Sequence, residues 1–434
     1  MRSSWPKLVL WNLLVALFLP VFLLAALLPG GRRDLLVWGS APLTSNKYWS
    51  EAMKAGGRAS MTIMNTVYAI NNRSDFDRLF EDFAPAFLPR PLRFAIGACL
   101  AFIYVLRRAQ VVHTSFWGFA LTQSLFWRLE SWFFRRAGVK TVVTGFGADA
   151  YMYSRIVDTS VRYGLLASYP ALARSEAATR RKVEHWNRHA DAIVVGLMID
   201  GMGRWDVTVN QFFQIDTAAW TPKPIYSPND GVNGPVRILH TPNHRGFKGT
   251  EFLVDAVEKL RGEGLQIDLV LLEKVPNEEV KSVMQTVDIL AEQFIGIGYA
   301  FSAIEGMASG LPVMANLEHE AYTRVYRRYG FLNECPVLST SPETLADNLR
   351  ALVRDPALRE TLGRASRAFA EKYHSYETAL YLFGSIHDKI VHGRDIDLIN
   401  LFHPLKSEYN RRTPLIRHPL TDNRLSANEP KREC

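Results

Sequence analysis

The chain has 434 residues, of which 48% are hydrophobic and 22% are charged, so it is long and apolar enough for two or three folded domains and is not a disordered chain. Its net charge of +8 favours an anionic partner, such as a nucleotide or an anionic membrane surface. The three cysteines (Cys99, Cys335 and Cys434) have no paired spacing and no Cys/His cluster, which argues against a disulfide framework and a structural zinc site and is consistent with a reducing compartment.

The first predicted element is an apolar segment from Leu8 to Leu28, in which only Asn12 is strongly polar. Its length matches the roughly 20 residues that span a bilayer. A signal peptide is the alternative, but the run is longer than a usual signal core and no A-x-A cleavage site precedes Pro29. We therefore predict an uncleaved membrane anchor over residues 1–31, whose balanced flanking charges do not decide its orientation.

A first α/β domain is predicted over residues 32–230. It opens with a strand, a helix and a second strand (Asp34–Ser40, Lys47–Ala55 with Ser45 as N-cap, and Ala59–Met64). This order forms a βαβ unit and predicts a parallel, doubly wound sheet. The turn that begins at Gly39 lacks the G-x-G-x-x-G fingerprint, so a dinucleotide site is not expected there, although Gly39 remains a candidate substrate contact.

Two further helices of this domain have apolar or aromatic faces. Residues 92–106 predict a core helix, with contact to a membrane surface as the alternative. Residues 121–137 predict an amphipathic helix rich in Trp, Phe and Arg, which suits either the headgroup region of an anionic bilayer or the outside of the domain.

Two polar side chains of the first domain are candidates for a site. His113 lies near the end of a predicted strand over residues 110–115, where ligands of parallel sheets collect, although a buried structural histidine is the alternative. Asp149 follows the strand over residues 139–144 and a Gly-Phe-Gly turn, where it could bind sugar or acceptor hydroxyls, or cap the next helix.

Prolines and glycines between residues 222 and 235 predict a boundary, and a second α/β domain is predicted over residues 231–390. Its further strands are predicted at 236–240, 267–272 and 287–290, and its helices at 250–260, 277–286, 343–353, 356–372 and 376–390. Arg245 and Lys248 lie three residues apart in a loop ahead of a helix, where they could bracket a diphosphate or form a solvated loop. A basic tail is predicted over residues 391–434, and its part over residues 404–434 is predicted to be disordered or attached to the surface.

The most informative stretch runs from Asp288 to Asn316. It predicts a strand, a loop with Gly296 and Gly298, a helix over residues 302–309 and another strand. Backbone N–H groups and the helix dipole favour a phosphate at such a loop. Glu305 in the helix could accept two hydroxyl hydrogen bonds, as from the vicinal diol of a ribose.

This stretch resembles the donor-site signature of the retaining GT-B glycosyltransferases. The loop Gly298-Tyr299-Ala300, the glutamate Glu305 and the ending Ala308–Val313 match the family pattern. The first glutamate of the pattern, which contacts the transferred sugar in the family, is Ile297 in this chain. Gln293 and Glu292, just upstream, are candidates for a substitute polar group.

The resemblance implies two Rossmann-like domains that face each other across a cleft. It implies transfer of a sugar from a nucleotide diphosphate sugar to a lipid-linked or cell-surface saccharide, with retention and without a metal or cofactor. Arg245, Lys248 and the N–H groups near Gly298 to Phe301 would then neutralise the leaving diphosphate. We expect an inner-membrane protein whose catalytic domains face the cytoplasm.

Two other functions remain open from the sequence. The loss of the first glutamate at Ile297 is compatible with a binding or scaffold protein that has a degenerate donor site. An epimerase acting on nucleotide sugars shares the two-domain architecture. A nucleic-acid partner is not expected, because the positive charge is dispersed and no recognised motif interleaves basic and aromatic residues.

Overall fold

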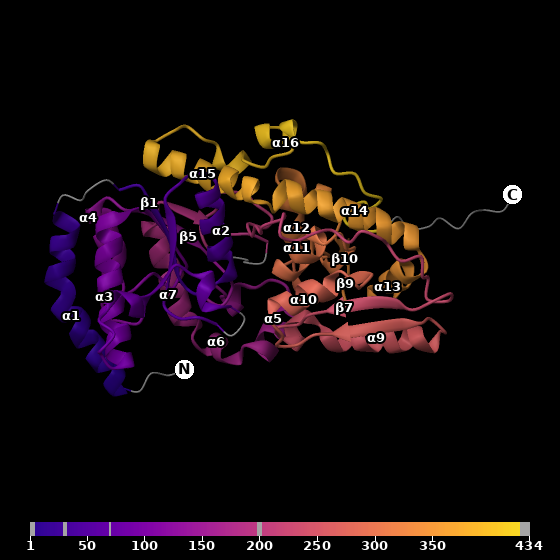
Figure 1. Cartoon of the computed structure of the whole chain (residues 1–434), viewed down its shortest axis with the longest axis horizontal. Coiled ribbons are helices and arrows are strands. Elements are labelled where there is room, and N and C mark those ends of the chain that lie inside the picture. The colour runs from indigo at the N-terminus through magenta and orange to yellow at the C-terminus, as the bar shows by residue number, and fades with distance from the viewer. Residues whose placement is uncertain (1–4, 29–32, 69–70, 198–201, 426–434) are drawn as a thin grey trace.

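The computed structural model describes residues 5–28, 33–68, 71–197 and 202–425. Two parallel β-sheets lie side by side, one formed by each half of the chain, with helices packed around both (Figure 1). The end of the predicted anchor at Pro29–Gly31 and the last part of the predicted tail, residues 426–434, lie outside the described residues.

The first sheet has six strands, β1 (Leu35–Ser40), β2 (Ser60–Met64), β3 (Arg78–Leu79), β4 (Ala109–Thr114), β5 (Lys140–Thr144) and β6 (Ala192–Val194). They lie in the order β3-β2-β1-β4-β5-β6, and all neighbours are parallel. The helices of this half are α2 (Thr44–Ala55), α3 (Arg90–Arg108), α4 (Leu129–Ala137), α5 (Thr159–Ser168), α6 (Pro170–Arg174) and α7 (Glu176–His189). The predicted parallel, doubly wound sheet is confirmed, and its strand order is that of a Rossmann-like domain.

The second sheet has strands β7 (Val236–His240), β8 (Ile267–Leu271), β9 (Ile289–Ile297), β10 (Val313–Asn316) and β11 (Leu338–Ser339). Their order is β11-β10-β9-β7-β8, again with parallel neighbours. The helices are α8 (Arg245–Lys248), α9 (Thr250–Gly262), α10 (Asn277–Met284), α11 (Phe301–Ala308), α12 (Glu320–Tyr329), α13 (Leu345–Arg354) and α14 (Pro356–Tyr373). The strand order reverses between β7 and β9, so ligands of such a sheet are expected beyond the carboxyl ends of these two strands.

The predicted helix over residues 121–137 is wrong in its first half, because α4 begins only at Leu129. The Glu130 carboxylate accepts the backbone N–H groups of Phe119, Ala120 and Leu121. A carboxylate that satisfies these donors holds the chain in a turn, and the residues before α4 therefore do not continue the helix.

The predicted loop around Gly296 is also shorter than expected, because β9 continues to Ile297. A Cβ atom at Gly296 would lie 2.5 Å from the Phe247 ring. The glycine at this position therefore allows α8 to pack against the strand.

The last long helix, α15 (Tyr376–His392), returns to the first half of the chain and packs against α2 (Figure 1). The Tyr376 hydroxyl donates to Glu51 Oε2 over 2.6 Å, and Arg58 Nη1 lies 3.2 Å from His387 Nδ1. The chain therefore crosses back from the second half to the first at α15.

Of the two alternatives for the tail, the disordered one is wrong for the described part, which contains the short helix α16 (Glu408–Arg412). Phe402, Tyr409 and Leu420 are buried, and the Tyr409 and Tyr381 rings stack with centroids 4.7 Å apart. A few large apolar side chains are enough to hold this basic segment against α15.

The N-terminal helix α1 (Trp5–Leu27) is the one described helix that is long and apolar enough to span a membrane, with a mean hydropathy of 2.6. It lies at the outer edge of the first half, beside α3 and α4 (Figure 1).

Candidate functional site

Lys248 forms a buried ion pair at the carboxyl end of the second sheet. Its ammonium contacts Glu292 on β9 and donates to Gln293 Oε1 over 3.0 Å. The Lys248 side chain is 7% exposed and that of Glu292 is 0% exposed. Both charges are thus removed from water, and each depends on the other for compensation.

Glu292 and Gln293 connect this pair to the glycine loop and to α11. Ser302 Oγ donates to Glu292 Oε1 over 3.0 Å, and Gln293 Nε2 donates to the Gly298 carbonyl oxygen over 2.8 Å. Glu292 Oε2 is buried and has no hydrogen-bond partner within the described residues. The two residues that the sequence offered as substitutes for the missing glutamate therefore lie beside the predicted diphosphate-binding lysine.

The loop before α11 leads into the N-terminus of that helix. Gly298 has a φ of 100°, a value that favours glycine, and its N–H donates to the Asn316 carbonyl oxygen over 2.8 Å. Ala300 is the N-cap of α11, and Phe301 is its first residue. The positive end of the helix dipole therefore lies at this loop.

Glu305 lies one turn into α11 and is 6% exposed. Burial raises the pKa of its carboxyl to about 7, although a hydrogen bond from Asn277 Nδ2 to Glu305 Oε1, 3.2 Å long, acts in the opposite direction. Burial and the nearby Glu305 also raise the pKa of Tyr48, on α2 of the first half. The Tyr48 ring lies 6.2 Å, between centroids, from that of Phe301, so a tyrosine of the opposite half lies at the start of the helix that carries Glu305.

Aromatic side chains of the first half also cover the start of α11. The Phe213 and Phe301 rings stack with centroids 4.5 Å apart, and Gln211 Nε2 donates to the Tyr299 carbonyl oxygen over 2.6 Å. The two halves are thus in direct contact at the predicted donor loop.

Arg245 and Lys248 contact different partners in this structure. Its guanidinium lies 2.8 Å from Glu251 and 3.3 Å from Glu273 and is partly exposed, whereas the ammonium of Lys248 is turned inward. The two cations lie on one helical turn but contact different carboxylates, because their side chains leave α8 in different directions.

Ile297, at the position of the missing glutamate, lies in an apolar surrounding. It lines a gap of about 20 Å³ between the two halves, together with Phe247, Tyr322, Tyr151 and Leu197. An isoleucine fits these neighbours, and a carboxylate at this position would be desolvated.

His113 lies inside the first domain and away from the donor residues. It stacks on Trp38 with centroids 3.6 Å apart, and His113 Nε2 lies 2.8 Å from His387 Nε2 on α15. Burial, with His387 beside it, lowers the pKa of His113 well below its usual range. This environment favours the buried structural histidine over the predicted catalytic group.

Gly39 is explained by strand packing. A Cβ atom at Gly39 would lie 2.0 Å from the carbonyl oxygen of Ile63, its partner on β2. Close approach of the two strands accounts for the glycine without a substrate.

Asp149 is fully buried and connects two loops of the first domain. Its carboxylate accepts the N–H groups of Phe116 and Phe146 at 2.9 Å and of Gly147 at 3.1 Å. Burial raises the pKa of Asp149 to about 6, although these hydrogen bonds act in the opposite direction. Asp149 does not cap the next helix, as the sequence alternative proposed, because its partners precede it in the chain and the N-cap of α5 is Asp158; its buried contacts are those of a structural carboxylate.

Replacing Asp149 with asparagine should therefore lower the free energy of unfolding by about 1–3 kcal/mol, because an amide NH₂ would face a buried backbone donor. Urea denaturation measures this difference, with Asp255→Asn on the exposed side of α9 as the control. Unchanged stability together with a loss of acceptor affinity would instead place Asp149 in the acceptor site.

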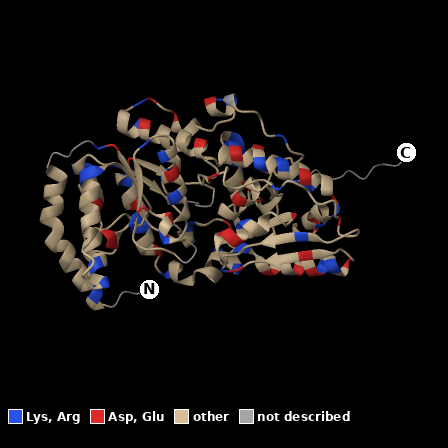
Figure 2. Ribbon diagram, viewed as in Figure 1, with Lys and Arg blue, Asp and Glu red and all other residues tan. Residues whose placement is uncertain are grey.

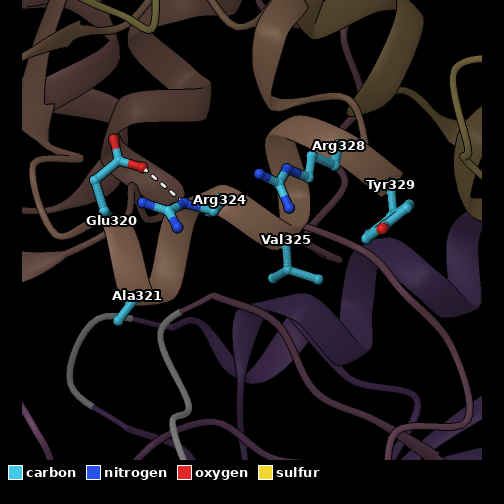
Figure 3. A pocket seen from close by; sticks show the side chains of 6 residues that line it. All are labelled: Glu320, Ala321, Arg324, Val325, Arg328 and Tyr329. Carbon is cyan, nitrogen blue, oxygen red and sulfur yellow. Dashed lines mark hydrogen bonds and ion pairs between the residues drawn. The ribbon is translucent and has the colours of Figure 1, made fainter.

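A hollow of about 440 Å³ lies over α12, away from the predicted donor residues. It is lined by Glu320, Ala321, Arg324, Val325, Arg328 and Tyr329 (Figure 3). Arg324 is paired with Glu320 over 3.4 Å. None of the predicted site residues lines this hollow.

Comparisons with known proteins support the architecture. No protein-family model matches the chain, and no curated protein matches it. Among solved structures, sucrose-phosphate synthase from Thermosynechococcus elongatus has a TM-score of 0.50 at 15% identity, over 84% of this chain and 100% of that chain. The chain has the GT-B fold. An alpha-glucosyltransferase in complex with UDP and DNA gives the same TM-score of 0.50 at 11% identity, over 83% of this chain and 100% of that chain.

Proposed function

We propose that the chain is a glycosyltransferase that uses a nucleotide diphosphate sugar as donor. The observation that carries the proposal is the buried Lys248–Glu292 pair beside the loop before α11. Glu305 lies one turn into α11. All of these groups lie at the carboxyl end of the second sheet, next to the point where its strand order reverses.

In this proposal, Glu305 binds the ribose hydroxyls and Lys248 binds the diphosphate. Negative charge grows on the diphosphate as the glycosidic bond breaks, and the lysine and the N–H groups at the start of α11 stabilise it. These groups act without a metal or a cofactor, and the reaction proceeds with retention. Arg245 contributes from the rim after exchanging its carboxylate partners for phosphate.

Glu292 takes the place of the missing glutamate in this account. Its Oε2 atom has no partner among the described residues, and its Oε1 atom already contacts Lys248 and Ser302. A carboxylate that is fixed beside the diphosphate-binding lysine can accept a hydroxyl hydrogen bond from the transferred sugar.

The donor reaches these residues only after the two halves separate, because Phe213 and Tyr48 lie against Phe301. Closure over the donor then excludes water, which strengthens the electrostatic contacts in the site. The acceptor in this proposal is a lipid-linked or cell-surface saccharide. The protein attaches to the inner membrane and faces the cytoplasm.

A panel of UDP-, GDP- and ADP-sugars tests the proposal, and a UDP-sugar is the first choice because a protein of this fold was solved with UDP. We expect transfer, or slow hydrolysis, with at least one donor. Binding without turnover would support the scaffold alternative, and an isomerised donor would support an epimerase. No binding of any nucleotide sugar would contradict all three assignments.

A further inference from the structure

The N-terminal helix is packed lengthwise against the first domain. Phe22 is fully buried, and its ring centroid lies 5.0 Å from that of Phe102 on α3 and 5.8 Å from that of Phe133 on α4. The Asn12 side chain, the polar group within the apolar run, is turned inward and accepts the N–H of Leu125 over 2.7 Å. The helix is therefore part of the fold of this domain.

The opposite side of α1 is apolar and exposed. The exposed fractions are 62% for Leu10, 59% for Leu13, 75% for Leu17 and 57% for Leu24. These residues recur every three to seven positions, so they lie on one side of the helix. Between its first turn and Leu27, α1 carries no charged residue (Figure 2).

The exposed apolar surface continues onto the residues beside α1. Leu125 is 81% exposed and Trp132 on α4 is 46% exposed. Trp132 packs against Phe133, which contacts α1 through Phe22. Contiguous apolar patches of this kind mark sites of contact with a membrane or a partner. We call the outer side of α1 with Leu125 and Trp132 the α1 face.

Basic residues border the α1 face at its ends. Lys7 is exposed at the start of α1. At the other end, the Arg107 guanidinium donates to the Leu28 carbonyl oxygen over 2.8 Å, and Arg108 is exposed beside it. Arg33 follows the end of α1 by six residues and so lies at this end as well; burial and the neighbouring Arg107 lower its pKa. Tryptophan and basic side chains around an apolar surface suit the headgroup region of an anionic bilayer.

We propose that the α1 face docks in the plane of one leaflet of an anionic phospholipid bilayer, so that α1 does not cross the membrane. An orientation of α1 along the bilayer normal would carry α3 and α4, against which it packs, into the hydrocarbon, together with the sheet that these two helices cover. Open sheet edges do not occur there, because their backbone groups would lack partners. In the in-plane orientation, the leucines enter the leaflet and both basic ends remain at the headgroups.

Sedimentation with vesicles tests the partner. The full chain should bind vesicles of phosphatidylcholine and phosphatidylglycerol in equal parts more tightly than vesicles of phosphatidylcholine alone. The expected difference in affinity is about fivefold for each basic side chain at the surface, and it should fall in high salt. The triple variant Leu13→Gln/Leu17→Gln/Leu24→Gln should lose most of the binding. The matched control Ile225→Gln/Val232→Gln/Leu405→Gln removes equally exposed aliphatic residues of the second half and should bind as the wild type does. Equal binding of the two triple variants, or no binding by the wild type, would overturn the proposal.

Thiol labelling tests the orientation. Single cysteines are introduced as Lys7→Cys or Arg33→Cys in a Cys434→Ser background. The two remaining native cysteines, Cys99 and Cys335, are buried and should not react. In membrane vesicles with the cytoplasmic face outward, a membrane-impermeant maleimide should label both positions before detergent is added. Labelling of one position only after detergent would show that α1 spans the bilayer and would overturn the in-plane orientation. Neither experiment depends on sugar transfer.

Discussion

Replacing Lys248 with methionine should lower the free energy of unfolding by about 3–5 kcal/mol, because it leaves the carboxylate of Glu292 buried without its counter-charge. Both side chains of this pair are almost fully removed from solvent. The same substitution should remove measurable nucleotide binding, since the ammonium is the buried cation at the proposed diphosphate position. Chemical denaturation and calorimetric titration measure the two effects.

The double variant Lys248→Met/Glu292→Gln separates stability from binding. Without a buried charge it should regain most of the lost stability, whereas nucleotide binding should stay lost. Lys259→Met, on the exposed side of α9, is the matched control and should change stability by less than about 0.5 kcal/mol. A double variant that binds nucleotide as well as the wild type would remove Lys248 from the donor site.

Replacing Glu305 with glutamine should make the protein more stable than the wild type at pH 8, by roughly 3 kcal/mol. Burial raises the pKa of Glu305 from 4.5 in the unfolded chain to about 7 in the folded protein, so the folded state favours the protonated carboxyl. The stabilising effect of the protonated Glu305 carboxyl is fully present below pH 4.5 and is lost as the pH rises through about 7. The amide carries no proton to lose, and the two proteins should therefore converge in stability toward low pH.

The same variant should bind nucleotide about 10- to 100-fold more weakly at pH 8, because an ionised carboxylate accepts hydroxyl hydrogen bonds more strongly than an amide. Wild-type affinity should rise as the pH passes about 7, where Glu305 ionises, and the variant should lack this rise. Glu279→Gln, at an exposed position of α10, is the control. Equal affinity and the same pH profile in the variant and the wild type would exclude Glu305 from the ribose site.

Much of the fold could be predicted from the sequence, because its strands are short apolar runs bounded by turns. The predicted strand over residues 236–240 matches β7, and the predicted helix over residues 302–309 differs from α11 by one residue at each end. The juxtaposition of Lys248 with Glu292 and Gln293 was not predicted, because it depends on the pairing of β7 with β9, which are not consecutive in the chain, and on the extension of β9 beyond the predicted end at residue 290.

The errors come from contacts between residues far apart in the chain. His113 is a good site candidate by its position at the end of a strand, but its ring faces His387, which is 274 residues away. The carboxylate of Asp149 accepts a hydrogen bond from the N–H of Phe116, which lies in another loop. Local sequence contains no signal for such partners, nor for Tyr48 beside Phe301, since each depends on how distant elements pack.

Asn277 and Ser302 were not predicted as site residues, although local signals exist for both. Asn277 begins the helix that follows β8, and Ser302 lies in the first turn of α11, so both lie at the ligand-binding end of the sheet. A polar residue at such a position can contact a ligand or a neighbouring side chain, and the sequence does not distinguish the two. The structure shows that they contact Glu305 and Glu292.

Calorimetric titration of the full chain with UDP, GDP and ADP tests the central claim most directly, namely that the second half binds a nucleotide diphosphate through Lys248. We predict that at least one of the three binds in a one-to-one complex, and that the folded double variant Lys248→Met/Glu292→Gln does not bind it. Binding of none of the three to the wild type, or equal binding to the double variant, would contradict the claim.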